Sequence, residues 1–129
     1  MNDIHESGED YLEAILCLKE ENGIARSVDV ARRLNVSKPS VSRAMSILEE
    51  KGYVFVGKIG SLELTEEGKK LADEIYARHV LLTRFLQKIT GVSEEQAEEN
   101  ACKIEHDIDD DTYDKIRLFY EKNISEEKE

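Results

Sequence analysis

Three residue types that bind transition metals lie close together in the stretch NACKIEHDI, residues 100–108. Side chains three or four residues apart on a helix point to the same side, so Cys102, Glu105 and His106 would share one face. A thiolate, a carboxylate and an imidazole together suit a divalent first-row transition metal. An ordinary helix with a small buried cysteine would give the same pattern, so the stretch alone leaves both interpretations open.

Further candidate ligands lie far from this stretch. Asp10 and Glu13 are three residues apart on an expected first helix, and His79 lies near the middle of an expected long helix. Carboxylates and imidazole favour manganese or iron, whereas a thiolate shifts the preference toward iron, cobalt or zinc. An acid pair at this spacing is more often a solvated helix face, and a single histidine is seldom a ligand.

The charge of the chain is unevenly distributed. The net charge of the 129 residues is −11, which argues against general attraction to nucleic acid or membranes if the charge were spread evenly. Residues 23–60, however, hold seven basic and three acidic residues, a net +4 that leaves −15 for the remainder. This basic window predicts one face that binds phosphate in an otherwise acidic protein.

The cysteine content and the hydropathy indicate the class of protein. Two cysteines cannot form a disulfide framework, and with no signal peptide they predict reduced thiols in the cytoplasm. No apolar run approaches the roughly 20 residues of a membrane span, so we expect no membrane association. The length suits one domain or two small ones.

Periodicity and turn residues predict a mainly α-helical fold with a small β-hairpin. We expect a first helix over residues 7–21, and a short second helix that is capped by Ser27 and buries Val28, Ala31 and Leu34. A third helix begins at the cap Ser37, with Pro39 in its first turn. Strands over 53–56 and 62–64 flank a turn at 57–61. Three more helices are expected, over residues 65–88, from the capping box at Ser93, and over 111–122.

The order of short helix, tight turn, polar helix and hairpin is that of a winged helix-turn-helix, which predicts DNA binding. Arg43 could hydrogen-bond a guanine edge in two places, a contact that discriminates bases by about 1–3 kcal/mol. Serines near the start of the third helix could donate to phosphates, and Lys58 suits a wing that lies on the DNA backbone. Three packed helices with solvated serines are the alternative, but the basic window coincides with the expected DNA face. The candidate DNA-binding residues are Arg26, Ser37, Lys38, Pro39, Ser40, Ser42, Arg43 and Lys58.

Several stretches carry a family resemblance: EDYLEAI at 9–15, VARRLNVSKPSVSRAMSILEEKGYV at 30–54, LTEEGKKLA at 64–72, ARHVLLTRFL at 77–86 and ACKIEHDI at 101–108. The chain resembles the diphtheria-toxin-repressor and manganese-transport-regulator (DtxR/MntR) family of metal-dependent repressors. The resemblance implies a winged helix-turn-helix DNA-binding domain over residues 1–70. It implies an all-helical dimerisation and metal-binding domain over residues 71–129. The expected partners are a palindromic double-stranded DNA operator and a second copy that pairs through the C-terminal helices.

The same resemblance implies a ligand set, with Glu98 able to assist. The implied metal ligands are Asp10, Glu13, His79, Cys102, Glu105 and His106. The first-helix acids are similar to those of the manganese branch, whereas Cys102 is similar to the iron branch. We therefore expect manganese or iron as the cofactor, one or two ions per subunit, with cobalt, nickel or zinc able to substitute in vitro. Thr83 and Glu98 replace two iron-branch ligands, so the second iron-type site is not expected in its usual form.

The expected function is a metal-activated transcriptional repressor that controls manganese or iron homeostasis. One alternative is a winged-helix regulator that responds to a small organic ligand, with Cys102 and His106 structural. Another is a metalloenzyme that uses Glu13 or Glu105 as a general base. No Ser/His/Asp arrangement or phosphate-binding loop is visible, so we expect no enzyme and no catalytic residues.

Overall fold

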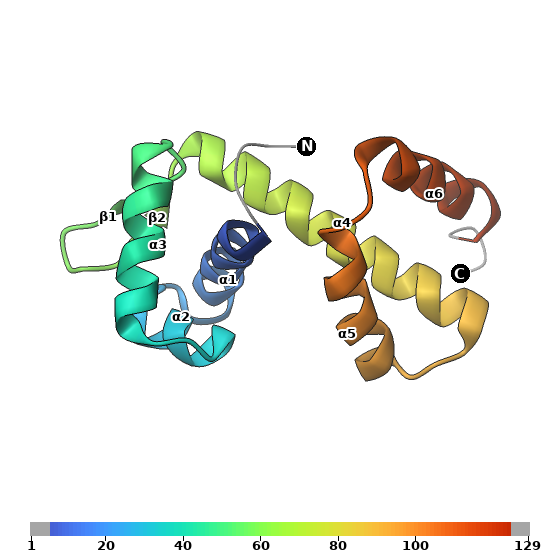
Figure 1. The fold of residues 1–129 in the computed structure, drawn as a ribbon, viewed down its shortest axis with the longest axis horizontal. Coiled ribbons are helices and arrows are strands. Elements are labelled where there is room, and N and C mark those ends of the chain that lie inside the picture. The colour runs from blue at the N-terminus through green and yellow to red at the C-terminus, as the bar shows by residue number, and fades with distance from the viewer. Residues whose placement is uncertain (1–5, 125–129) are drawn as a thin grey trace. The chain divides into compact units, whose positions relative to one another are not determined.

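The computed structural model describes residues 6–124, and their helices and strands are shown in Figure 1. In chain order these are α1 (Glu6–Asn22), α2 (Ser27–Leu34), α3 (Lys38–Glu50), β1 (Val54–Val56), β2 (Leu62–Leu64), α4 (Glu66–Thr90), α5 (Glu94–Glu105) and α6 (Asp110–Asn123). β1 and β2 form an antiparallel hairpin in which Val54 lies opposite Leu64. This architecture confirms the expected mainly helical fold with a hairpin wing. The chain divides into two compact units, with the boundary between Glu74 and Ile75 inside α4.

In the N-terminal unit, α1, α2, α3 and the hairpin pack on one another. Leu12, Ile15, Val30, Val41 and Leu48 are almost completely buried. The backbone N–H of Leu62 in β2 donates to the carbonyl of Ala25, 2.8 Å away, which attaches the hairpin to the segment between α1 and α2.

The start of α3 is as predicted. The Ser37 hydroxyl accepts a hydrogen bond from the backbone N–H of Ser40 over 3.2 Å, and Pro39 lies in the first turn. Val41, Met45 and Leu48 form the buried stripe. Because these apolar positions face the core, the polar side chains between them face solvent.

The prediction for α2 was wrong in its details. Arg26 occupies the N-cap position and makes no side-chain capping bond, so Ser27 is the first helical residue rather than the cap. Val28 is 39% exposed, whereas Val30 is completely buried. Ala31 is buried as predicted, and packing against both α1 and α3 buries Val30 beside it instead of Val28.

The long helix α4 begins where the hairpin ends, as predicted, and its first turn packs closely on the entry to the hairpin. Thr65 Oγ1 accepts a hydrogen bond from the N–H of Gly68 over 3.0 Å. A Cβ atom at Gly68 would lie 1.9 Å from the carbonyl oxygen of Tyr53. Only glycine therefore permits this approach, which explains its place in the stretch LTEEGKKLA.

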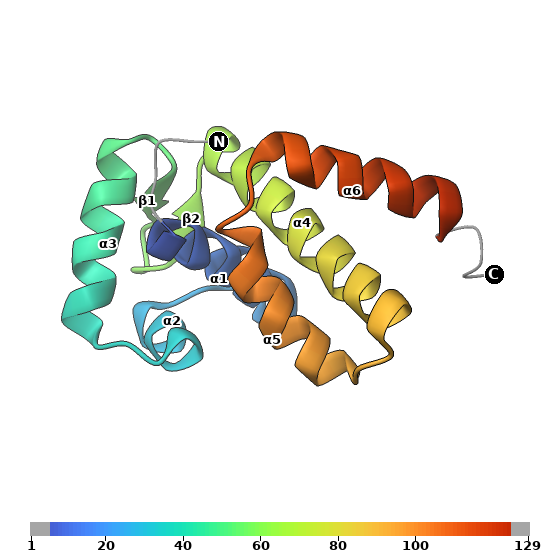
Figure 2. The same cartoon turned by 45° about the vertical axis from the view of Figure 1, so that its right-hand side comes forward.

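In the C-terminal unit, the second part of α4 packs with α5 and α6 (Figure 2). Their core contains Leu82 of α4, Ala101 of α5 and Tyr113 of α6. The predicted cap Ser93 accepts from the N–H of Gln96 over 3.1 Å, and Asp109 caps α6 in the same way through Thr112. Among residues 6–124, no helix is both long and apolar enough to cross a membrane.

Candidate functional site

Glu105, the last residue of α5, is a buried carboxylate that contacts α4. Its side chain is 1% exposed, and Nδ1 of His79 donates to its Oε1 over 2.7 Å. A histidine that donates from Nδ1 to a carboxylate keeps Nε2 unprotonated in its neutral form, which is the arrangement found in histidine ligands of metals. That Nε2 lies 3.8 Å from the Glu98 carboxylate, also on α5.

The second oxygen of Glu105 has no hydrogen-bond donor. Oε2 is buried and accepts no hydrogen bond from any described residue. Nε2 of His106 lies 3.5 Å from it, which is too far for a strong hydrogen bond but within ion-pair distance. Burying a carboxylate oxygen without a partner is costly, and a bound cation would remove that cost. The donor set therefore fits a metal ion at Oε2.

Cys102 and His106 lie on the same side of α5 as Glu105. The thiol of Cys102 and a ring nitrogen of His106 lie within 4.8 Å of each other. His106 itself is the C-cap of α5, but its φ of −90° and ψ of −13° are still right-handed, so the predicted shared face persists. Cys102 is exposed, which leaves its thiol accessible to an ion.

Cys17 differs from Cys102. It lies half-buried on α1, and burial raises the pKa of its thiol above the usual 9.0. Nearby Glu13 and Glu21 raise that pKa further, although Arg33 opposes them. A thiol that stays protonated is a poor nucleophile and a poor metal ligand, so Cys17 acts as a small packing residue of α1.

Asp10 and Glu13 belong to α1, in the N-terminal unit. Both are half-buried, and their spacing of three residues places them on one face of the helix. Glu9, Tyr11 and Leu12 around them are buried. These two acids are thus held on a well-packed helix, as a ligand pair requires.

Arg78 is a structural residue of the C-terminal unit that was not predicted from the sequence. Its guanidinium binds the Asp110 carboxylate at 3.0 Å and donates to the backbone carbonyl of Glu105 at 3.4 Å. It also lies 4.4 Å from the centre of the Tyr113 ring, a cation–π distance. Arg78 therefore joins α4 to the end of α5 and the start of α6. The only signal in the sequence is its position next to His79.

The predicted DNA-binding residues lie in the N-terminal unit, mostly at its surface. Lys38, Pro39, Ser42 and Arg43 of α3 are exposed, and Ser40 is half-buried. The rest are also exposed and lie at the caps of α2 and α3 and in the hairpin loop; they are Arg26, Ser37 and Lys58.

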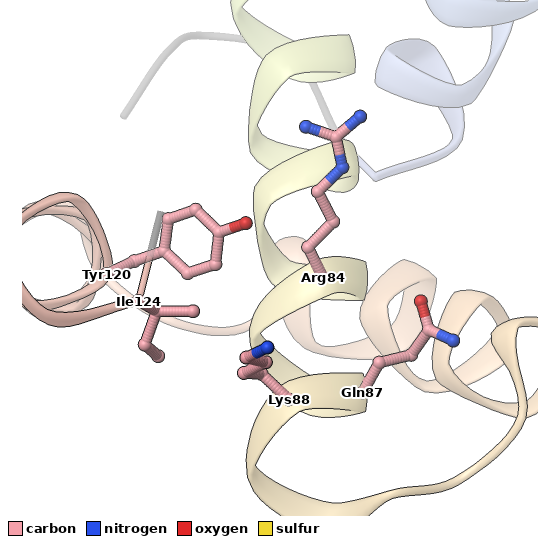
Figure 3. Close-up of a pocket in the computed structure, with 5 residues that line it drawn as sticks. All are labelled: Arg84, Gln87, Lys88, Tyr120 and Ile124. Atoms are coloured by element: carbon pink, nitrogen blue, oxygen red, sulfur yellow. The ribbon is translucent and has the colours of Figure 1, made fainter. Parts of the chain in front are cut away.

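Two adjoining hollows lie between α4 and α6 in the C-terminal unit. One, of about 330 Å³, is shown in Figure 3, where Tyr120 and Ile124 lie across from side chains of α4. The other, of about 360 Å³, is mostly apolar. Together they are lined by Tyr76, Ala77, Val80, Leu81, Arg84, Gln87, Lys88, Tyr120 and Ile124. Arg84 and Tyr120 line both, so the hollows form one shallow groove.

Two family descriptions match nearly the whole chain. Residues 3–61 match "Iron dependent repressor, N-terminal DNA binding domain". Residues 65–125 match "Iron dependent repressor, metal binding and dimerisation domain". The transcriptional regulator MntR of Escherichia coli O6:H1 is 40% identical over 115 residues, which cover 89% of this chain and 74% of that protein.

Solved structures agree with these matches. IdeR of T. acidophilum superposes with a TM-score of 0.79 at 26% identity, over 94% of this chain and 56% of that one. The manganese regulator SloR gives 0.78 at 28% identity, over 88% and 53%. The chain thus spans about half the length of these two structures.

Proposed function

Because this chain belongs to the iron-dependent repressor family, we propose that a divalent ion bound at Glu105 activates it to bind a palindromic DNA operator. The protein is a metal-dependent, DNA-binding transcriptional repressor and not an enzyme, and its cofactor is a divalent metal, manganese or iron. The Oε2 atom of Glu105, which accepts no hydrogen bond from any described residue, is the observation that carries the proposal, since a bound cation would balance its buried negative charge.

The proposed ligands come from both units. His79, Cys102, Glu105 and His106 would bind from the C-terminal unit, with Glu98 assisting. Manganese and iron take more than four ligands and favour carboxylate oxygens, and Asp10 and Glu13 would supply these from α1. Because the ligand set combines a thiol with carboxylates, we propose manganese or iron, with one or two ions per subunit.

The proposed activation rests on charge. When bound, the ion supplies the positive charge that offsets neighbouring carboxylates. Without it, Asp10, Glu13 and Glu105 would repel one another, and α1 would be held loosely. Joining α1 to α5 would then favour one arrangement of the two DNA-binding units of a dimer. Coupling of this kind is typically about 1–3 kcal/mol, or about 5–150-fold in operator affinity.

In the proposed complex, α3 enters the major groove. Arg43 would read a guanine, and Ser40 and Ser42 are small enough to bring the helix close to base edges. Ser37, Lys38 and Pro39 at the start of α3 would contact the phosphate backbone, together with Arg26 and Lys58. A two-fold dimer would then read two half-sites about 34–36 Å apart, which is why we propose a palindrome.

The homodimer would form through the C-terminal unit, which matches a dimerisation domain. Among the apolar residues of α6, Tyr113 and Tyr120 are buried within the subunit, whereas Phe119 is 53% exposed. Leu118, next to Phe119 in the chain, is 54% exposed. We propose that a second copy covers Leu118, Phe119 and the adjoining groove. The cytoplasm, where thiols stay reduced, is the proposed location.

Operator affinity measured against each metal tests the proposal. The assay is run anaerobically, so that Cys102 stays reduced, with manganese, iron, cobalt or zinc. We expect the wild type to gain affinity with manganese or iron, and the double variant Cys102→Ala, Glu105→Ala to gain none. Glu99→Ala, an exposed acid on the same helix, is the control. A full metal response in the double variant would refute the proposal. Operator binding that ignores a chelator would instead favour a regulator of the small-organic-ligand kind.

A further inference from the structure

A hydrogen-bonded ion pair joins α1 to the hairpin. Nζ of Lys19 donates to Oε1 of Glu63 in β2, and the hydroxyl of Ser61 donates to the other oxygen, Oε2, over 2.6 Å. Ser61 is buried, and the side chains of Lys19 and Glu63 are 36% and 25% exposed, so the pair is partly shielded from solvent. Both oxygens of the carboxylate are therefore held, one from the helix and one from the hairpin itself.

The hairpin is closely fitted around this ion pair. The N–H of Gly57 donates to the carbonyl of Ser61 over 2.7 Å, which joins the end of one strand to the start of the other. A Cβ atom at Gly57 would lie 2.6 Å from the hydroxyl oxygen of Ser61, so a larger residue would push that hydroxyl away from Glu63. The hydrogen bonds from Lys19 and Ser61 lower the pKa of Glu63, which keeps the carboxylate charged at neutral pH. A displacement of α1 at Lys19 would therefore reach both strands.

The helix that donates this ion pair also carries two of the proposed metal ligands, Asp10 and Glu13. Lys19 follows Asp10 by nine residues, which is about two and a half helical turns, so the two side chains project from opposite sides of α1. Between them the helix is uninterrupted, and Leu12 and Ile15 are completely buried in the core of the N-terminal unit. Because a helix packed in this way moves as one body, a restraint on its acidic side also restrains Lys19.

We propose that Lys19 and Glu63 are positioning residues that transmit metal binding at α1 to the hairpin. An ion that holds Asp10 and Glu13 would fix α1, and the ion pair would then fix the hairpin, whose strand β1 packs against α3. Neither Lys19 nor Glu63 binds the metal in this scheme. Together they increase the gain in operator affinity that the ion produces, and they leave the affinity of the free protein for the ion unchanged. The inference rests on the proposed metal-activated binding of an operator.

A second ion pair on α1 provides a matched control. Glu21 pairs with Arg33 of α2 at 3.2 Å, and their side chains are 54% and 38% exposed. This pair joins α1 to α2 and not to the hairpin, and ion pairs this exposed contribute little to stability. Removing it changes the same helix by one charge without touching the proposed route to the hairpin.

The ratio of operator affinities with and without metal tests the inference in the full-length protein. The ion is manganese or iron, whichever activates the wild type, and affinity is measured by fluorescence anisotropy well below the melting temperature of each variant. Lys19→Met and Glu63→Gln should each lower this ratio about five-fold, a change of the size that couplings between sites usually have. The Kd of the free protein for the ion should not change. Glu21→Gln should keep the wild-type ratio.

A charge-swapped variant separates transmission from stability. The double variant Lys19→Glu, Glu63→Lys restores opposite charges at the same two positions, so its ratio should return toward that of the wild type. Coupling is also reciprocal, so operator DNA should raise the affinity for metal by the same factor as metal raises the affinity for the operator. Both factors should fall together in Lys19→Met.

Two results would overturn the inference. One is a wild-type ratio in Lys19→Met and Glu63→Gln, even with lowered melting temperatures, because the ion pair would then only stabilise the fold. The other is a charge-swapped variant whose ratio stays as low as that of the single variants. If metal gives the wild type no gain in operator affinity, the proposed function fails rather than this inference alone.

Discussion

Glu105 uses its two carboxylate oxygens differently. Oε1 accepts a hydrogen bond from His79, whereas Oε2 accepts none from any described residue. The hydrogen bond from His79 to Oε1 holds the side chain in place, and Oε2 places the carboxylate's negative charge in a buried position. The sequence predicted that Cys102, Glu105 and His106 share a face, because helical spacing determines this. It could not predict which of these residues is buried, because burial depends on how α4 and α6 pack around α5.

Replacing Glu105 by Gln should separate the fold from the metal response. Glutamine keeps a partner for His79 but removes the buried charge, so we expect the metal-free variant to be as stable as the wild type or more stable. It should lose the stabilisation by metal, which is about 2.7 kcal/mol when the ion is at 100 times its Kd. Thermal melts with and without manganese measure both effects. Glu99→Gln, with an equally small side-chain change at an exposed position, should retain the full metal shift.

Arg78 should matter both for stability and for the metal. Arg78→Met removes the ion pair with Asp110 and the contact with Tyr113, and we expect a loss of about 1–3 kcal/mol in the free energy of unfolding. Because Arg78 also holds the carbonyl of Glu105, metal affinity should fall as well. Urea unfolding and metal titration give the two quantities. Arg117→Met, which removes exposed pairs on α6 alone, is the control and should change neither by more than about 0.5 kcal/mol.

At the scale of elements, α1 and the hairpin are joined by Lys19, Glu63 and Ser61. Lys19 and Ser61 hydrogen-bond the Glu63 carboxylate and lower its pKa below the ordinary value of 4.5. The strands themselves were predictable from β-prone runs around a glycine-containing turn. The contact with α1 was not, because it joins residues 44 positions apart. The incorrect burial predicted for Val28 of α2 has a similar cause, because tertiary packing determines which residues of a short helix are buried.

The lowered pKa of Glu63 makes the contribution of this contact depend on pH. A carboxylate whose pKa is lower in the folded state stabilises the fold above its unfolded pKa, and this stabilisation is lost as the pH falls through the folded value. Glu63→Gln should therefore be less stable than the wild type at pH 7, and the difference should shrink as the pH falls below the ordinary value of 4.5. Urea midpoints over that range test it. Asp73→Asn removes an exposed helical pair with Lys69 and should give a much smaller difference. A difference in stability between Glu63→Gln and the wild type that does not change with pH would contradict this prediction.

At the scale of the whole molecule, the chain combines a DNA-binding unit with a helical unit that senses metal and dimerises. The sequence predicted this organisation because caps, glycines and apolar periods are local signals, and because long stretches resemble one family. It also predicted that the C-terminal helices pair two copies of the chain, without showing which of their apolar residues do so. Tyr113 and Tyr120 close the subunit's own core, whereas Leu118 and Phe119 remain exposed. Only the three-dimensional structure shows which apolar residues of α6 are buried in the core and which are exposed.

The exposed pair predicts where dimerisation can be disrupted. The double variant Leu118→Asp, Phe119→Asp should remain folded, because both side chains are about half exposed in the subunit, but it should sediment as a monomer. Operator affinity should fall with it, because one half-site contact is lost. Analytical ultracentrifugation measures the mass. Asp111→Asn, an exposed change on the same helix, should leave the dimer intact. A double variant that still sediments as a dimer would place the interface elsewhere.

The unbalanced oxygen of Glu105 also has a consequence for how long the protein survives in a cell. Proteases cut chains that open transiently, and the open population shrinks when an ion binds the closed form alone. A cell starved of the metal would lose this regulator by turnover as well as by inactivation. Its abundance would then follow the supply of the nutrient it monitors.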